Sequence, residues 1–338
     1  RYPECWRCHE ELVFRVADEW FISMAELRPK MIDAARKVRW VPEHAGRRME
    51  NWLGNMGDWN ISRKRYWGVP LPFYTCANGH LFVVGSEDEL RKLATSGLDQ
   101  LRELHRPWID RVVVGCPQDG TDSVRVKEVG DTWLDAGVVP FSTLDFQHDR
   151  KRWETWFPAD YVVEMVEQVR LWFYSLLFFS VVLTEKPPYR VVQTFEPMLD
   201  ESGGEFHKTG ENVVLLSEVM EKVGADAIRW TVSRQRADEV MLFSLKALEE
   251  IKRRLLVLWN TYSFFVTYAE LNGFDPTAPQ VPASERPLMD RWLLSVLHRL
   301  VRDSRNGLEE WDVRTLTLRV EAFIEDLSQW YVRRSRPR

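Results

Sequence analysis

The chain has 338 residues, of which 45% are hydrophobic and 29% are charged, and its formal net charge is −5. This composition is typical of a globular protein and excludes wholesale disorder, and the length allows two or more domains with their own cores. The net charge provides no global basic field for nucleic acid, although a basic surface can still be local.

Cysteine content and hydropathy bear on the compartment. Four cysteines are too few for a disulfide framework, so a reducing compartment and a cytoplasmic location are expected. The most apolar run, Leu171 to Leu183, is shorter than the ~20 residues that a membrane span needs. Serines inside it and charges at both ends predict a buried helix, and no association with a membrane is expected.

The first 245 residues alternate between strand-like and helix-like segments. A strand is expected at Glu11–Val16, a helix at Ala25–Lys37, an irregular segment at Trp52–Pro72, a helix capped by Ser86 that runs to Leu104, strands at Arg111–Val114 and Ser123–Val129, and a turn-bearing segment at Asp131–Gly137. They are followed by strand, loop and buried helix over Phe157–Leu183, a strand at Tyr189–Thr194, and a helix at Ser217–Val223 that Gly224 ends. This alternation predicts an α/β domain with a mostly parallel sheet.

The pattern changes after Leu245. Apolar residues then recur with helical spacing in three stretches, which lie around residues 251–259, 288–300 and 316–331. The proline-rich linker Asn272–Pro287 separates the first stretch from the second. The sequence therefore predicts a helical bundle after the α/β domain.

Seven segments are dense runs of specific residue types. They are Trp40–His44, Trp59–Pro72, Asp131–Gly137, Phe157–Glu164, Glu167–Phe173, Gly224–Trp230 and Asp326–Arg334. In this order they resemble blocks of the isoleucyl-tRNA synthetases, a family of class I aminoacyl-tRNA synthetases. The longest match is Trp-x-Ile-Ser-Arg-x-Arg-Tyr-Trp-Gly within Trp59–Pro72. Valine and leucine enzymes carry related blocks.

The resemblance implies a domain order. Residues 1–45 would end the editing or connective insertion, and residues 46–245 would be the second half of the nucleotide-binding, Rossmann-like catalytic domain. Residues 246–338 would be a truncated α-helical anticodon-binding domain. No His-x-Gly-His motif is found in the chain, so the isolated chain is expected not to form an aminoacyl-adenylate.

One loop is similar to the family's Lys-Met-Ser-Lys-Ser loop, which neutralises phosphate charge. The corresponding segment here is Glu205-Phe-His-Lys-Thr209, and it keeps the second lysine. The resemblance assigns Lys208 to the phosphates of ATP, with His207 and Thr209 beside it.

The amino-acid and adenylate sites are also implied by the resemblance. Trp133 and Trp172 match two tryptophans that form the apolar isoleucine pocket, and one methylene is worth only ~1–3 kcal/mol in such a pocket. Glu164 matches a glutamate that contacts the adenylate, and Glu167 and Gln168 match an acid–amide pair at the same site.

Several residues depart from the family's pattern at this site. Met165 and Leu171 stand where the family usually has glycine. Larger side chains there could crowd the ligand, because glycine lets backbone and ligand approach closely. A divergent active enzyme and a decayed relative are both compatible with this departure.

The cysteines suggest zinc. Cys5-x-x-Cys8 looks like half of a zinc site whose other half lies upstream in this family, and a structural site needs four ligands. Cys76 and Cys116 match single members of a second set of paired cysteines in the family. Gly79 stands in place of one partner, and His80 is a possible substitute.

The expected function is therefore that of an isoleucine–tRNA ligase that uses ATP, Mg²⁺, L-isoleucine and tRNA(Ile), and that is a monomer when complete. One alternative is a catalytically inactive, synthetase-like, tRNA-binding paralogue. Another is a valine or leucine enzyme.

Overall fold

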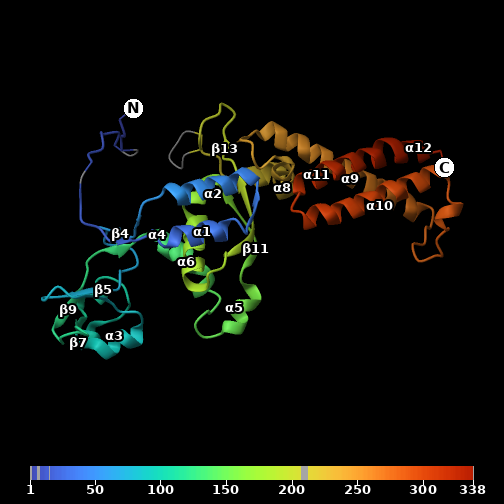
Figure 1. The fold of residues 1–338 in the computed structure, drawn as a ribbon. Coiled ribbons are helices and arrows are strands. Elements are labelled where there is room, and N and C mark those ends of the chain that lie inside the picture. Colours follow the sequence, from blue (N-terminus) through green and yellow to red (C-terminus); the bar gives the residue numbers. More distant parts are fainter. Residues whose placement is uncertain (1, 6–7, 15, 207–211, 338) are drawn as a thin grey trace. The chain divides into compact units, whose positions relative to one another are not determined.

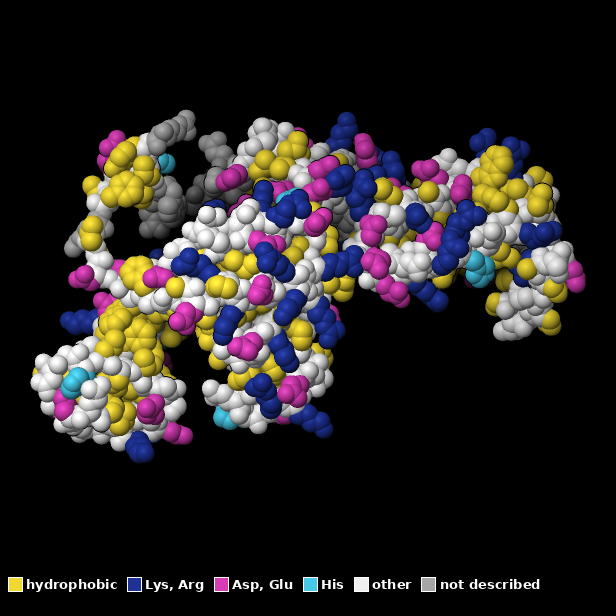
Figure 2. Space-filling view, viewed as in Figure 1, with side chains coloured by type: hydrophobic (Ala, Val, Ile, Leu, Met, Phe, Trp, Pro, Cys, Tyr) yellow, Lys and Arg dark blue, Asp and Glu magenta, His cyan; other side chains and the backbone are white. Residues whose placement is uncertain are grey.

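The structure is a computed structural model that describes residues 2–5, 8–14, 16–206 and 212–337 (Figure 1). The chain divides into two compact units, Arg1–Thr194 and Phe195–Arg338, and each is described by itself. On the face shown in Figure 2, basic and acidic side chains are interspersed over the helices of both units, in keeping with the small net charge.

A three-stranded sheet with three helices forms the main core of the first unit. The strands are β2 (Arg39–Val41), β11 (Ala159–Met165) and β12 (Tyr189–Phe195), and the helices are α1 (Leu27–Ala35), α2 (Glu43–Asn55) and α6 (Trp172–Thr184). The strand order is β11-β12-β2, and β2 runs parallel to β12, with Trp40 opposite Val192. The predicted helix at 25–37, the strand at 189–194 and the strand, loop and buried helix over 157–183 are confirmed.

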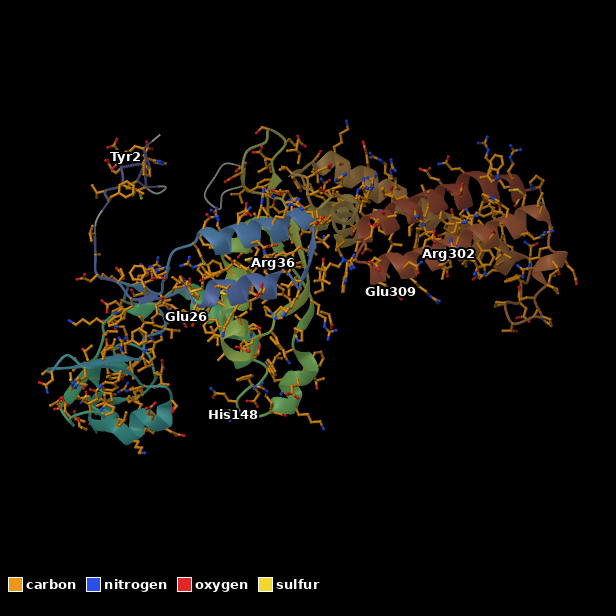
Figure 3. The ribbon with its side chains drawn as sticks, viewed as in Figure 1. Tyr2, Glu26, Arg36, His148, Arg302 and Glu309 are labelled. Atoms are coloured by element: carbon orange, nitrogen blue, oxygen red, sulfur yellow. The ribbon has the colours of Figure 1, made fainter. Side chains whose placement is uncertain are left out.

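Helix α2 corrects the expectation that the chain is irregular from Trp52 onward. The helix begins after Pro42 and continues to Asn55, and it buries Met49 and Leu53 fully. Its neighbour Trp40 lies so close that a Cβ on Gly46 would be 2.6 Å from the indole Cδ1. The residue Arg36, just after α1, donates from Nε to Glu50 Oε2 of α2 at 2.8 Å and links the two helices (Figure 3).

Helix α6 is the apolar centre of this unit. The stretch Val166–Thr184 is long and apolar enough to cross a membrane by length and composition, and 56% of its most apolar window is buried. Phe173 and Leu177 are fully buried in the main core. These contacts are those of a core helix, as the sequence predicts.

A further helix, α4 (Thr132–Ser142), packs on α6 and was not expected from the sequence. The sequence predicts a turn-bearing segment at Asp131–Gly137, but Asp131 caps the helix and accepts the backbone N–H of Trp133 at 3.3 Å. Gly137 allows the close packing, because a Cβ there would lie 2.7 Å from Ser175 O. The short helix α5 (Arg150–Trp156) follows and buries Trp153 beside Phe157.

An antiparallel sheet lies at the lower left in Figure 1 and belongs to the first unit. It has the order β6-β5-β9-β8-β7 and comprises β5 (Phe73–Cys76), β6 (Leu81–Val83), β7 (Ala94–Ser96), β8 (Val113–Gly115) and β9 (Asp122–Arg125). Helix α3 (Glu87–Leu93) covers a core that includes Tyr74, Leu90 and Val114. The predicted strands at 111–114 and 123–129 correspond to β8, β9 and β10 (Val129–Gly130), but β8 and β9 lie in an antiparallel sheet, and not in a parallel one as expected.

Two predicted elements of the first unit are wrong: a helix is shorter than expected, and a strand does not form. Ser86 does cap α3 by accepting the Glu89 N–H at 3.1 Å, but the helix ends at Leu93 and not at Leu104. The next residues pair with β8, and Gly97 turns the chain at φ +84°. The described part of 11–16 forms no strand beyond the single bridge Glu4–Glu11, and Val13, Phe14 and Val16 are exposed.

Two short ladders hold the tryptophan-rich segment. They pair β1 (Phe21–Ile22) with β3 (Trp59–Asn60), and β4 (Ser62–Arg63) with β10 (Val129–Gly130), both antiparallel. The segment predicted as irregular over Trp52–Pro72 therefore contains part of α2 and two short strands.

The second unit is mainly helical and confirms the predicted bundle. Its elements are β13 (Met198–Leu199), α7 (Leu216–Val223), α8 (Ala225–Arg234), β14 (Met241–Leu242), α9 (Leu245–Leu271), α10 (Leu288–Glu309), α11 (Val313–Glu325), a π-helical turn (Asp326–Val332) and α12 (Arg333–Ser335). Gly224 ends α7 at φ +85°, as predicted. Glu321 of α11 accepts from Trp230 Nε1 at 2.8 Å and from Arg254, and so ties α11 to α8 and α9.

Candidate functional site

A buried carboxylate connects the longest family-like block to α4. Asp131 is 5% exposed, and its Oδ2 accepts from Arg63 at 2.9 Å and from Trp59 Nε1 at 3.3 Å. The charge of Asp131 is therefore paired and hydrogen-bonded inside the unit. This network fixes the start of α4, the helix that carries Trp133.

Trp133 and Trp172, the predicted walls of an amino-acid pocket, lie on the two packed helices α4 and α6. The indole Nε1 of Trp172 donates to Ala136 O at 3.0 Å, which holds its ring against α4. Both side chains are half-buried and pack against the main core. The structure thus places the two tryptophans on neighbouring helices.

The three predicted polar residues lie at the end of β11 and in the following 3₁₀ turn, Val166–Arg170. Gln168 Oε1 accepts the backbone N–H of Trp172 at 3.1 Å, so it satisfies a donor in the first turn of α6. Glu164 Oε2 accepts the N–H of Met165 at 2.9 Å. Both side chains are thereby held by neighbouring backbone groups.

Glu167 has a different environment from Gln168. It lines a cleft of about 440 Å³ together with Arg170 and with residues of α2. The lining residues from α2 are Arg48, Asn51, Trp52 and Asn55. Sequence reasoning missed this cleft, because it did not recognise α2, whose polar face supplies half of the lining.

The predicted phosphate-binding residues His207, Lys208 and Thr209 lie outside the described residues. The described residues on either side form a closed loop base. Asn212 Nδ2 donates to Asp200 Oδ2 at 2.8 Å and to Glu205 O at 3.0 Å. The two ends of the loop are therefore joined through one amide side chain.

Asp200 organises this loop base and was not singled out from the sequence. Its Oδ1 accepts from Ser202 Oγ at 2.6 Å, from the Ser202 N–H and from the Gly204 N–H at 2.8 Å. These hydrogen bonds hold the pKa of the Asp200 carboxyl well below its usual range. The bond from Ser202 has the largest effect on the pKa, and the bond from Asn212 has the next largest. A Cβ at Gly204 would lie 2.9 Å from Asp200 Oδ2, so glycine permits this approach.

The cysteines fall into two separate places. Cys5 is half-buried and Cys8 is exposed, and the chain folds back there through the backbone bond from His9 N to Cys5 O. Among the described residues, one group of at least three potential metal ligands occurs, and it consists of Cys76, His80, Cys116 and Asp119. Cys5 and Cys8 do not belong to it.

The comparisons with known proteins identify the class. Residues 4–243 match the family described as tRNA synthetases class I (I, L, M and V), and residues 290–338 match the anticodon-binding domain of tRNA ligase. The chain belongs to the class I tRNA synthetase family. The fold therefore combines a class I catalytic domain with a helical anticodon-binding domain.

Individual proteins of this family are similar to the chain. The isoleucine–tRNA ligase of Methanopyrus kandleri is 39% identical over 357 residues, which cover 100% of this chain and 33% of the relative. The chain thus spans about a third of the length of this curated relative. A Mycobacterium tuberculosis methionyl-tRNA synthetase bound by methionyl-adenylate has a similar fold, with a TM-score of 0.66 at 15% identity over 99% of this chain and 56% of that one. A LeuRS of Agrobacterium radiobacter K84, in a ternary complex with tRNA and LeuAMS, gives 0.64 at 19% identity over 83% of this chain and 37% of that one.

Proposed function

We propose that this chain is part of an isoleucine–tRNA ligase that activates L-isoleucine with ATP and transfers it to tRNA(Ile). The observation that carries the proposal is the 39% identity to an isoleucine–tRNA ligase along the whole of this chain. The Trp59–Pro72 block, which Asp131 anchors through Trp59 and Arg63, supports it. The activity is a property of the whole protein, which would be a cytoplasmic monomer.

The proposed reaction has two steps. The isoleucine carboxylate attacks the α-phosphorus of ATP, which forms isoleucyl-adenylate and releases pyrophosphate. A hydroxyl of the terminal tRNA ribose then attacks the adenylate carbonyl carbon and releases AMP. Both steps place charge on oxygen atoms, so they need fixed donors.

Lys208, with His207 and Thr209 beside it, would supply such donors to the phosphates. Mg²⁺, bound mainly through the phosphates of ATP, would neutralise part of their charge. The Asp200–Asn212 contact supports this assignment, because it closes the base of the loop that carries these residues.

The side chains of the first unit would bind the amino acid and the adenylate. Trp133 and Trp172, on packed helices, would form the apolar walls around the isoleucine side chain. Glu164 would accept hydrogen bonds from the adenylate, and Glu167 and Gln168 would hold polar groups of the substrate. Cys5 and Cys8 would contribute half of a zinc site, with the other ligands supplied elsewhere in the whole protein.

A catalytically inactive tRNA-binding paralogue is the second candidate. The observation that favours it is the pair Met165 and Leu171, which stand where this family usually has glycine. Leu171 has an unusual backbone conformation, with φ −122° and ψ −101°, directly before α6. Such bulk beside the substrate residues would weaken ligand binding if the backbone did not compensate.

Amino-acid-dependent exchange of pyrophosphate into ATP tests the first step. We expect the protein expressed from its complete reading frame to catalyse exchange with isoleucine far better than with valine, leucine or methionine. Lys208→Ala should reduce exchange at least ~10-fold, since one donor to developing charge is worth ~10²–10³ in other enzymes. Trp172→Ala should raise the KM for isoleucine, whereas Trp172→Phe should retain more affinity.

The outcomes separate the candidates. Exchange that is strongest with valine or leucine would assign the protein to another member of the class. A folded protein that binds tRNA but exchanges with none of the four amino acids would leave the inactive paralogue.

A further inference from the structure

One carboxylate of the second unit joins three helices that lie in different parts of the family match. Glu321 lies on α11, within the residues that match the anticodon-binding domain. Trp230 and Arg234 lie on α8, within the residues that match the class I synthetase family. Helix α9, between the two matched regions, carries Arg254. Helix α11 packs against both α8 and α9 (Figure 1).

The side chain of Glu321 is surrounded by donors and is only 11% exposed. Its Oε1 accepts a hydrogen bond from Trp230 Nε1 at 2.8 Å and lies 3.0 Å from Arg234 Nε in an ion pair. Its Oε2 accepts a hydrogen bond from Arg254 Nη1 at 3.4 Å. Each carboxylate oxygen therefore has a donor, and two guanidinium groups compensate the charge.

Apolar packing between these helices is incomplete beside Glu321. A small pocket of about 70 Å³ remains there, and its lining includes Trp230 of α8, Leu255 of α9 and Ile324 of α11. Protein interiors are ordinarily close-packed, and side chains that line a gap lose the contacts that would otherwise cross it. The polar contacts of Glu321 therefore carry a larger share of holding α11 in one orientation on α8.

The orientation of α11 bears on only one of the two proposed reaction steps. Adenylate formation joins isoleucine to ATP and needs no tRNA. Transfer needs the terminal ribose of a tRNA whose anticodon end would be held by the domain that contains α11. A small rotation of α11 on α8 would displace the distant end of the tRNA, whereas the attacking hydroxyl must come within about 3–3.5 Å of the adenylate carbonyl carbon.

We propose that Glu321 is a positioning residue for the transfer step. Through Trp230, Arg234 and Arg254 it holds the anticodon-binding helix α11 in the orientation that brings the terminal ribose to the adenylate. This inference rests on the proposed function, because it assigns Glu321 to one step of that reaction. Loss of Glu321 should therefore slow transfer and spare adenylate formation, in contrast to loss of Lys208.

Two assays on the protein expressed from its complete reading frame test this role. They are isoleucine-dependent exchange of pyrophosphate into ATP and charging of tRNA(Ile). We expect Glu321→Ala to charge at least ~10-fold more slowly, with exchange unchanged, since a displacement of about 1 Å can cost ~10²-fold in rate. The matched control is Glu325→Ala, because Glu325 is exposed, lies one turn further along α11 and carries the same charge.

Conservative variants separate the contacts of Glu321. Glu321→Gln keeps an oxygen that can accept from Trp230 but carries no charge for the two arginines. Trp230→Phe keeps an aromatic ring against the apolar core but lacks the N–H. Each should slow charging less than Glu321→Ala does. Trp230→Phe added to Glu321→Ala should cause little further loss, because the two groups act through one hydrogen bond.

The outcomes separate failure of this inference from failure of the proposed function. A parent protein that neither exchanges nor charges would overturn both. In an active parent, equal charging by Glu321→Ala and Glu325→Ala would overturn the positioning role alone. Exchange and charging that fall by the same factor in every variant of Glu321 and Trp230 would show that these contacts only stabilise the fold. Glu321→Gln and Trp230→Phe decide the question if Glu321→Ala does not fold.

Discussion

Asp200 shows how one carboxylate can fix the base of a loop. It accepts hydrogen bonds from Ser202, Gly204 and Asn212, and these hydrogen bonds lower its pKa, so it stays charged in more acidic solution than an ordinary aspartate does. The resemblance to the lysine loop directs attention to Lys208 but gives no reason to examine Asp200. Its role follows from the turn geometry, which depends on contacts between both ends of the loop.

Replacement of Asp200 tests whether the loop base matters for activation. Asp200→Ala removes the acceptor for four donors, so we expect isoleucine-dependent exchange to fall about 10-fold, equivalent to roughly 1.4 kcal/mol. The effect should appear in kcat and in the KM for ATP, with the KM for isoleucine nearly unchanged. Glu201→Ala, at the exposed neighbouring position, is the control. Equal kinetics for the two variants would contradict the role of Asp200.

Among helices and strands, the sequence predicts an element best where apolar residues recur at regular spacing over a long stretch and so mark its buried face. The helices of the bundle and the core helix α6 were predicted for this reason. Helices α2 and α4 were missed because glycines and prolines, such as Gly46 and Pro140, resemble loop signals. Gly46 in fact allows α2 to pack closely on Trp40 of β2, and Gly137 allows α4 to pack closely on α6, which the sequence of one helix does not reveal.

Strand predictions failed where a segment's pairing with a distant strand decides whether it forms a strand. The apolar run at Glu11–Val16 has strand-like composition, but Val13, Phe14 and Val16 are exposed and bury no face. In the opposite direction, Ala94–Ser96 reads as the end of a helix but pairs with β8. Distant partners also explain why Asp119 was overlooked, since its proximity to Cys76 depends on the pairing of β5 with β9.

A half-buried ion pair anchors the antiparallel sheet to the tryptophan-rich segment. The Arg125 side chain is 1% exposed and donates from Nε to Asp110 Oδ1 at 3.0 Å and from NH1 to the carbonyl oxygens of Leu71 and Glu128. Asp110 also accepts from Arg106 Nε at 2.7 Å. Removing Arg125 would leave the carbonyl oxygens of Leu71 and Glu128 without this donor.

Arg125→Ala should therefore destabilise this region by about 1–3 kcal/mol, measured by urea unfolding. Arg91→Ala breaks the exposed Glu87–Arg91 pair and should cost less than about 1 kcal/mol. Equal effects of the two substitutions would contradict the anchoring role of Arg125.

The same ion pair predicts a pH dependence. Burial raises the pKa of Asp110, but hydrogen bonds from Arg125 and Arg106 outweigh it, so the pKa lies below its ordinary value. A lowered folded-state pKa gives stability that is present above the unfolded value of about 3.9 and is lost as pH falls through the folded value. Arg125→Ala should reduce this acid sensitivity, and an unchanged acid-unfolding profile would count against it.

At the scale of the whole molecule, the chain joins part of a class I catalytic domain to an anticodon-binding domain. The family and the two kinds of domain follow from collinear motifs that the sequence already displays. The residue contacts that position them, such as those of Asp131, Asp200 and Glu321, required the folded structure. Because the chain spans about a third of its curated relative, the complete protein is the proper object of a functional test.

The measurement that tests the central proposal most directly is charging of tRNA by the complete protein with each of the branched amino acids. We expect isoleucine to accumulate on tRNA(Ile), with Lys208→Ala far slower and the Glu201→Ala control as active as the parent. Accumulation of valine or leucine on its own tRNA instead would contradict the isoleucine assignment. Absence of charging by a folded protein that binds tRNA would contradict the ligase function itself.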